Sequence, residues 1–390
     1  MSATLSAGPA PQALSRARHA SRTLFAALGV FGGVWGVHIP SVKQQFELTE
    51  SGLSMVLLSI AVGAVLSLFF AGRVIGGLGA RRATMIASAV MGLLLAAVLN
   101  WPGLAWLLPA GVVFGAAMSL FDVAINADGT ALEAASGRAV LGSLHGSFSL
   151  GGMAGATLAA AMLRAEIAPA WQLGGVGLAL VIVVWTAARG MLDAHPSADG
   201  DGDEPQAHFA WPRGTLLVIG LLIFSGMTAE GVMYDWSVLY LKQELAMPQD
   251  AAGVGFAVFS AAMAAARFGG DALRSRYAEH LLLRNGALLA TVAMAVLLLV
   301  GNPWLALVGY ACVGVGLALC VPILFNAATR VPGVSRAAAI ASVSSIGYSG
   351  FLIGPPLIGF VAHHASLTAA LGLVVVAAAA LAIGARRVSC

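Results

Sequence analysis

The sequence predicts an all-α polytopic membrane protein with twelve transmembrane helices. Of the 390 residues 59% are hydrophobic and 9% are charged, and the mean hydropathy is +0.90. Apolar runs of helical length recur along almost the whole chain, and the basic residues gather in alternate breaks between them. A soluble domain carries about 25% charged residues. A soluble enzyme of this length is therefore excluded, and so is a secreted chain with a single signal peptide.

The apolar runs have the length that a bilayer requires. A hydrocarbon core of about 30 Å takes about 20 helical residues to cross, and backbone in lipid must satisfy its own hydrogen bonds. The short alternating segments typical of a barrel are absent from the sequence. We expect helices over residues 22–40, 51–72, 83–100, 103–126, 139–163, 171–190, 214–240, 252–270, 284–301, 303–326, 337–361 and 366–385.

Two polar stretches organise the chain. Residues 1–20 are small, polar and partly basic, which predicts a disordered cytoplasmic tail. Residues 191–213 place an acidic cluster among Gly, Pro and Ala, which predicts a flexible cytoplasmic linker. The expected halves are residues 21–190 and 214–390, with six helices each. Internal matches indicate a duplicated unit: Arg73, Gly76, Arg82 and Asn126 match Arg267, Gly270, Arg276 and Asn326.

The basic residues test the helix count. With the N-terminus inside, seventeen of the 20 Lys and Arg residues fall on the cytoplasmic face, and the other three are Lys43, Arg164 and Lys242. This is the positive-inside bias. The net charge of +3 therefore reflects topology, and no nucleic-acid partner is expected. Cys312, Cys320 and Cys390 fit neither a disulfide framework nor a metal-ligand spacing, so we expect no metal and no cofactor.

The loop from Gly72 to Arg82, between the second and third helices, keeps several glycines and a terminal basic pair. It resembles the G-x-x-x-D-R-x-G-R-[RK] signature of the major facilitator superfamily, although Gly76 stands in place of the acid. The second-half copy does contain an acid. The resemblance covers residues 22 to 387 and implies a latch that holds one conformation, formed by Arg73, Arg81, Arg82, Arg267, Asp271 and Arg276. The alternative is that these arginines only anchor the topology.

Two further motifs, Asp122-x-x-x-Asn126 and His145-Gly146, resemble the fucose-permease-like branch of that superfamily and its uncharacterised bacterial inner-membrane relatives. The resemblance implies a transporter in the cell inner membrane, with both termini cytoplasmic and no enzymatic activity.

Ionisable groups inside spans are costly and usually mark a pathway or a pair. Glu230 lies sixteen residues into its helix, about 24 Å from the start, with no basic residue in the same span. Burial there favours the protonated carboxyl, so Glu230 is our first candidate for proton coupling; the alternative is a hydrated acid at a cavity mouth. Tyr234 shares its helix face, and Asp235 lies nearer the outer end, so both are candidates to line a cavity.

Asp122 and Asn126 share one face of the fourth helix, and Asn326 recurs at the equivalent position of the second half. We expect the two amides to line a substrate cavity and Asp122 to be a second proton site. His145 lies as far after the cytoplasmic loop as Asp122 lies before it, so the two could meet at one depth, where a carboxylate would tune the imidazole. The alternatives are a hydrated helix end and a packing histidine.

Three further side chains are candidates for the cavity. Trp35 and His38 lie late in the first helix, where an aromatic ring could contact a sugar-like solute. Tyr348 lies near the middle of the eleventh span, where its hydroxyl needs a partner. Trp35 could instead be an interface anchor.

These patterns favour a secondary active transporter that moves a small polar or amphipathic solute, sugar-like by resemblance, by alternating access. The sequence contains no G-x-x-x-x-G-K-[ST] loop for nucleotide, so we expect an ion gradient as the driving force, with protons as the coupling ion. The alternatives are a proton-driven exporter of drugs or metabolites, a solute sensor that does not transport, and an intramembrane enzyme. The last would need a catalytic motif such as HExxH or GxSxG, and neither is present.

The basic-residue distribution predicts that both termini and the linker are cytoplasmic. Reporter fusions after residues 200 and 390 should both show cytoplasmic activity, because the positive-inside bias places both sites on that face. A periplasmic signal at either site would contradict the twelve-span topology.

Overall fold

The computed structural model describes residues 11–192 and 211–387. In this part of the chain, twelve helical stretches are long and apolar enough to cross a membrane, which confirms the predicted fold class. The first half contains α1 (Pro11–Gln45), α2 (Glu50–Leu78), α3 (Ala80–Ala97), the 3-10 turn η1 (Val98–Asn100), α4 (Leu104–Ser136), α5 (Leu141–Arg164) and α6 (Pro169–Ala188). The second half contains α7 (Gly214–Gln243), α8 (Gln249–Arg274), α9 (Glu279–Val300), α10 (Pro303–Leu317), α11 (Cys320–Ala328), α12 (Arg336–His364), α13 (Leu367–Gly384) and the 3-10 turn η2 (Ala385–Arg387).

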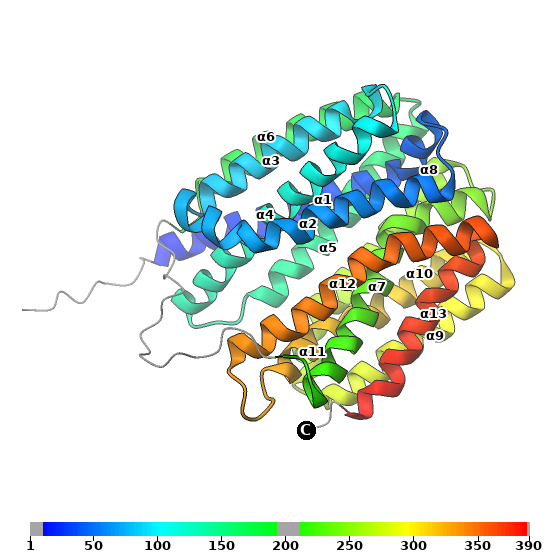
Figure 1. The fold of residues 1–390 in the computed structure, drawn as a ribbon. Helices are drawn as coiled ribbons and strands as arrows, with labels where there is room; N and C mark the ends of the chain where they lie inside the picture. The colour runs from blue at the N-terminus through cyan, green and yellow to red at the C-terminus, as the bar shows by residue number, and fades with distance from the viewer. Residues whose placement is uncertain (1–10, 193–210, 388–390) are drawn as a thin grey trace, which may run out of the picture.

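The helices run up and down between two ends of one bundle (Figure 1). We call the end with the start of α1 and residues 192 and 211 the linker end, and the opposite end, with the turns α1–α2 and α7–α8, the far end. Residue 387 also lies at the linker end (Figure 1).

One expected boundary is wrong, and one expected span contains a break in its helix. The tail predicted over residues 1–20 is shorter, because α1 begins at Pro11 and buries Ala17 and Ala20; residues 1–10 lie outside the described part. The span predicted over 303–326 is broken between α10 and α11. Pro322 explains the break, since it has no N–H to donate to the carbonyl four residues earlier, at Ala318.

Glycines allow the backbones of α1 and α5 to touch. A Cβ built on Gly29 would overlap the carbonyl oxygen of Phe148, and one on Gly151 would overlap that of Ala26. Small residues at such positions let helices approach closely in lipid, where van der Waals packing replaces the hydrophobic effect. α1 and α5 are therefore fixed to each other as one wall of the first half.

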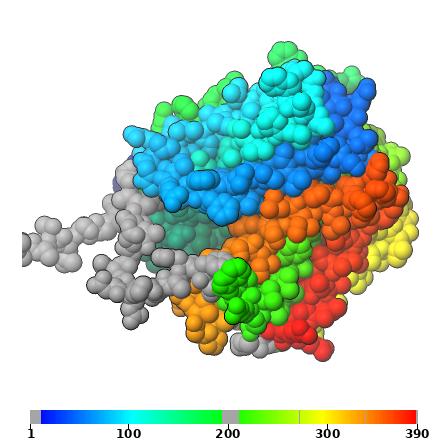
Figure 2. Space-filling model, in the orientation of Figure 1, coloured from blue at the N-terminus to red at the C-terminus, as the bar shows by residue number. Residues whose placement is uncertain are grey.

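The two halves meet at the far end through glycines on both sides of the boundary. There, Gly359 of α12 lies against Ser54 of α2, and Gly253 of α8 lies against Val37 of α1. Toward the linker end, Figure 2 shows a hollow between the halves with the teal surface of α5 at its floor. The bundle is therefore closed at the far end and hollowed from the linker end.

The glycine contacts predict a stability difference between two neighbouring substitutions. Gly29→Ala should destabilise the protein by about 1–3 kcal/mol, because the new methyl group overlaps backbone that cannot move aside. Gly32→Ala is the matched control on the same helix, where an added Cβ meets nothing within 4 Å. Thermal unfolding in detergent should show a lower midpoint for Gly29→Ala alone, and equal midpoints would contradict the close packing.

Candidate functional site

A buried ion pair lies at the boundary between the two halves. Arg267 of α8 donates from Nη2 to Oε1 of Glu230 on α7 at 3.0 Å, and the two side chains are only 12% and 15% exposed. No cation lies within the predicted span over residues 214–240, and Lys242 is in the last turn of α7, so the partner of Glu230 comes from the neighbouring helix α8. Arg267 was expected at the cytoplasmic face; instead it lies two helical turns inside the end of α8, and its long side chain reaches further into the bundle.

Tyr234 and Ser149 extend this pair. The Tyr234 hydroxyl donates to Oε1 of Glu230 at 3.2 Å, and Nη1 of Arg267 donates to Oγ of Ser149 at 2.9 Å. Ser149 belongs to α5, so the guanidinium joins the second half to the first. Ser149 was not among the predicted site residues, although Ser149 lies one turn after His145 on the same face of α5.

Aromatic rings surround Tyr234 beside the pair. The Tyr234 ring lies 6.4, 5.5 and 5.6 Å from the rings of Phe148, Phe256 and Phe259, centroid to centroid. Such surroundings keep the local dielectric low, which strengthens charge interactions and makes an unpaired charge costly. Separating Arg267 from Glu230 would therefore leave an unpaired buried charge, which is unfavourable.

His145 is exposed toward this arrangement from α5. Its ring lies edge-on to Phe25, with centroids 5.3 Å apart, and the charge within reach of the imidazole is that of Arg267. Among the described residues, no hydrogen bond or ion pair joins His145 to Asp122. The expected histidine–carboxylate contact is therefore absent from this conformation, because α5 turns the ring toward α1 and α8.

Asp122 and Asn126 form a second polar group, on α4. Asn126 donates from Nδ2 to Oδ1 of Asp122 at 3.0 Å and to its backbone oxygen at 2.9 Å. Tyr348, on α12 of the other half, is within electrostatic reach of Asp122 and lies 6.3 Å from the ring of Phe351. The structure thus brings three of the predicted cavity and proton residues together across the halves.

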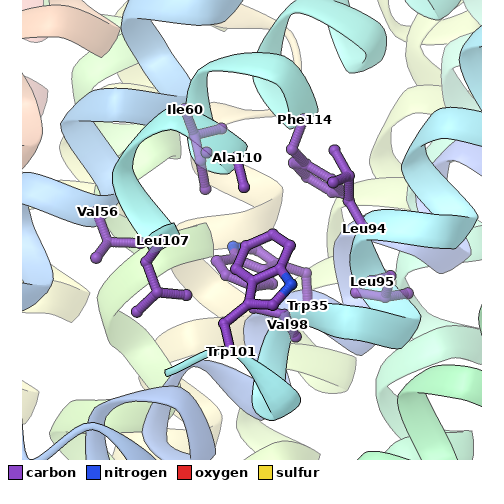
Figure 3. Close-up of a pocket in the computed structure, with 11 residues that line it drawn as sticks. Trp35, Val56, Ile60, Leu94, Leu95, Val98, Trp101, Leu107, Ala110 and Phe114 are labelled. Carbon is purple, nitrogen blue, oxygen red and sulfur yellow. The ribbon is translucent and has the colours of Figure 1, made fainter. Parts of the chain in front are cut away.

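Two side chains expected in a cavity lie inside the first half instead. His38 is fully buried and is hydrogen-bonded to Ser41 at 3.2 Å and to Gln172 at 3.0 Å. Trp35 lines an apolar pocket within the first half, together with Phe114 and Trp101 (Figure 3). Both point away from the other half because neighbouring helices offer them partners there.

Asn326 differs from the expected symmetric arrangement of the two amides. Asn326 donates to Glu279 at 2.9 Å, beside the Arg274 and Arg330 ion pairs of that carboxylate at 2.6 and 3.1 Å. Its amide therefore belongs to a charged cluster at the linker end that the sequence analysis missed. Asp235 is half-buried on α7, and its carboxylate makes no hydrogen bond or ion pair within the described residues.

The loop arginines occupy the linker end. Arg73, Arg82 and Arg276 are exposed, and Arg81 donates to the carbonyl of Met191, just after α6. The side chain of Asp271 lies outside the described residues. This contact of Arg81 lies within the first half.

Asp128 is a buried acid that the sequence analysis did not single out. Its carboxylate accepts from the Ser21 hydroxyl at 2.9 Å and from the Leu192 backbone N–H at 3.0 Å. Its spacing of six residues from Asp122 on one helix was the available signal. Asp128 ties the start of the linker to α1 and α4.

Two six-helix halves, closed at one end and hollowed from the other, with ionisable groups at their boundary, define a multi-pass membrane transporter. The family model of the Major Facilitator Superfamily matches residues 23–335. The chain belongs to this superfamily.

Known proteins resemble the chain along nearly its whole length. An uncharacterised MFS-type transporter of Yersinia pestis is 33% identical over 95% of each chain. The solved structure of a variant of the fucose:proton symporter of E. coli covers 96% of this chain and 98% of its own, at 17% identity and a TM-score of 0.66. A variant of the nucleoside transporter NupG covers the same shares, at 14% identity and a TM-score of 0.72. Both structures confirm the fold, and the fucose-permease-like resemblance agrees with them.

The buried pair predicts a non-additive effect on stability. Arg267→Met leaves the Glu230 carboxylate buried without its cation, which should cost about 3–5 kcal/mol. Adding Glu230→Gln removes that stranded charge, so the double variant should regain most of the lost stability. Thermal unfolding of both variants checks this, with Arg82→Met as the control at an exposed arginine. A double variant that is less stable than Arg267→Met would contradict the coupling.

Proposed function

We propose that this transporter is proton-coupled and that Glu230 is its proton site. The observation that carries the proposal is the Glu230–Arg267 pair, buried beside aromatic rings and joined to the other half through Ser149. Carboxyl groups in such surroundings can exchange a proton when the protein gives them access to water. Asp122 and His145 are secondary candidates, since they lie on the same boundary.

The geometry suggests how a proton could change the conformation. While Glu230 is ionised, it neutralises Arg267, and the guanidinium can hold Ser149 at 2.9 Å. A proton on the carboxyl group removes that neutralisation and leaves the guanidinium charge buried, which is unfavourable. The favoured response is for Arg267 to find water or solute oxygen atoms, and this loosens its contact with α5. Proton binding would in this way shift the balance between the two arrangements of the halves.

A small polar solute with several hydroxyl groups fits the site. The boundary offers the Asp122 carboxylate, the Asn126 amide, the Tyr348 hydroxyl and the His145 imidazole as hydrogen-bonding groups, with the Phe351 ring beside them. Such a combination binds sugar-like rings through both hydroxyl groups and an apolar face. The names of the fucose:proton symporter and the nucleoside transporter, both similar in fold, support the same substrate class.

The membrane placement follows from the charge distribution. We infer that the linker end, where the described part of the chain begins and ends and where most of the basic residues lie, faces the cytoplasm of a cell inner membrane. The hollow in Figure 2 would then open inward. Both uptake and proton-driven export use such a state; accumulation in right-side-out and inverted vesicles distinguishes them.

Replacement of Glu230 should separate coupled transport from exchange. Glu230→Gln imitates the protonated carboxyl, so pH-driven accumulation of substrate should be lost. Exchange between two equally loaded sides needs no net proton movement and should persist, which also shows that the variant is folded. Both activities can be measured in proteoliposomes with radiolabelled sugars.

Asp122→Asn is the matched control on α4. Because Asp122 is also proposed to contact the solute, the variant should bind solute more weakly, but the accumulation that remains should still depend on the pH gradient. If Asp122→Asn loses accumulation and Glu230→Gln keeps it, the proton site lies on α4 and the assignment to Glu230 is wrong.

A further inference from the structure

The duplicated turns at the far end carry the same lysine spacing in both halves. Lys43 donates to Oε1 of Glu50 at 2.6 Å, and Lys242 donates to Oε1 of Gln249 at 2.8 Å. In each case the acceptor lies seven residues after the lysine and begins the following helix. The first pair is an ion pair within one half. The second has an amide in place of the carboxylate.

The amide gives Gln249 a second role that a carboxylate could not perform. While Oε1 accepts from Lys242, Nε2 donates across the boundary to the backbone oxygen of Val37 at 2.9 Å and to Oγ of Ser41 at 2.8 Å. Both acceptors belong to α1 in the first half. An ionised carboxylate only accepts hydrogen bonds. A glutamate here would therefore keep the contact with Lys242 and lose the hydrogen bond to the Val37 carbonyl, and it could accept from Ser41 only if that hydroxyl turned away from His38.

Behind Ser41, a chain of hydrogen bonds continues into the first half. Ser41 lies 3.2 Å from Nδ1 of His38, Nε2 of His38 lies 3.0 Å from Oε1 of Gln172, and Nε2 of Gln172 donates to the Ile167 backbone oxygen at 2.7 Å. With Gln172 donating to Ile167, its oxygen must accept from His38. His38 then carries its proton on Nε2, and the Ser41 hydroxyl donates to Nδ1.

Every donor in this chain points the same way, from Lys242 through Gln249 and Ser41 to the α5–α6 turn. Aligned hydrogen bonds polarise one another and act as a unit. His38 and Gln172 are fully buried and Ser41 is 8% exposed, so a broken link would leave a buried polar group unpaired. This explains why His38, an ionisable residue in a span, points away from the boundary that it supports.

The packing around Gln249 depends on the closed arrangement. A Cβ on Gly253, one turn further along α8, would meet both methyl groups of Val37 at 3.2 Å, and Gly36 of α1 lies against the Phe256 ring. These glycines bring α1 and α8 close enough for the Gln249 amide to reach a backbone carbonyl. The hydrogen bonds can form only while the halves are closed at this end.

We propose that Gln249 is the clasp of the far-end gate: its amide holds α8 to α1 when the protein is open toward the linker end, and the buried chain through Ser41, His38 and Gln172 keeps the acceptor in place. Opening of the far end breaks both cross-boundary hydrogen bonds and leaves the Lys242 contact intact. Glu50 therefore stabilises the turn within the first half, whereas Gln249 stabilises the turn of the second half and also holds the two halves together. The clasp makes no use of the Glu230 proton site.

The isosteric change Gln249→Glu tests the clasp, because it keeps the Lys242 partner and removes the donor to α1. Glu50→Gln is the mirror control, which changes the equivalent residue of the first half. Nitroxide labels on Gln45 and Gln243, exposed ends of α1 and α7, report the separation of the halves at the far end by double electron–electron resonance, without substrate and at one pH.

For Gln249→Glu we expect the ratio of far-end-open to far-end-closed molecules to rise by about tenfold, the effect of losing one or two buried hydrogen bonds. Glu50→Gln should match the parent protein. Ser41→Ala, which removes one acceptor and keeps the Val37 carbonyl, should shift the distribution in the same direction by less. It serves as the second variant if Gln249→Glu does not fold.

An unchanged distance distribution in the folded Gln249→Glu protein, or in Ser41→Ala if the former does not fold, overturns the proposal. So does an equal shift in Glu50→Gln. Retained accumulation in Glu230→Gln would overturn the proton site and leave this result unaffected.

Discussion

In lipid, a polar group inside the bundle cannot rely on bulk water, so it needs a partner from the protein. Several buried polar side chains meet that constraint through helices that are distant in sequence, whereas buried serines such as Ser59 and Ser88 bond to the backbone of their own helix. Glu230 forms an ion pair with Arg267, and His38 is hydrogen-bonded to Gln172. Asp128 accepts hydrogen bonds from Ser21 and from the backbone N–H of Leu192. These pairings fix which faces of the helices turn toward each other. The arrangement of the halves and the chemistry at their boundary both follow from them.

The boundary between the halves therefore has two polar contacts with different characters. Arg267 reaches Ser149 while it also pairs with Glu230, and under the proposed function this contact would respond to a proton. At the far end, the Gln249 amide reaches α1 through uncharged groups, so that contact responds to the separation of the halves alone. A two-state element that both contacts bias is sufficient to couple a proton to alternating access.

The second half is built less regularly than the first, although both descend from one pattern. Pro322 interrupts the tenth span between α10 and α11, whereas the equivalent α4 is continuous and carries Asp122 at the matching position. Asn326 is held by Glu279 at the linker end, while Asn126 is held by Asp122 within the span. Duplication thus supplied one scaffold, and substitutions at equivalent positions gave the two copies different tasks.

The sequence by itself determined the number of spans, the helical class and the superfamily, because hydropathy, span length and charge distribution are local properties that lipid enforces residue by residue. It also singled out Glu230 as a candidate, since an acid deep in an apolar run is visible in one dimension. Three contacts could be recognised only in the tertiary structure. Arg267 pairs with Glu230 inside the bundle, His38 is hydrogen-bonded to Gln172, and Gln249 donates a hydrogen bond across the boundary to α1. Those outcomes depend on which helix faces which, and partners separated by 37, 134 and 212 positions leave no periodic signal in the chain.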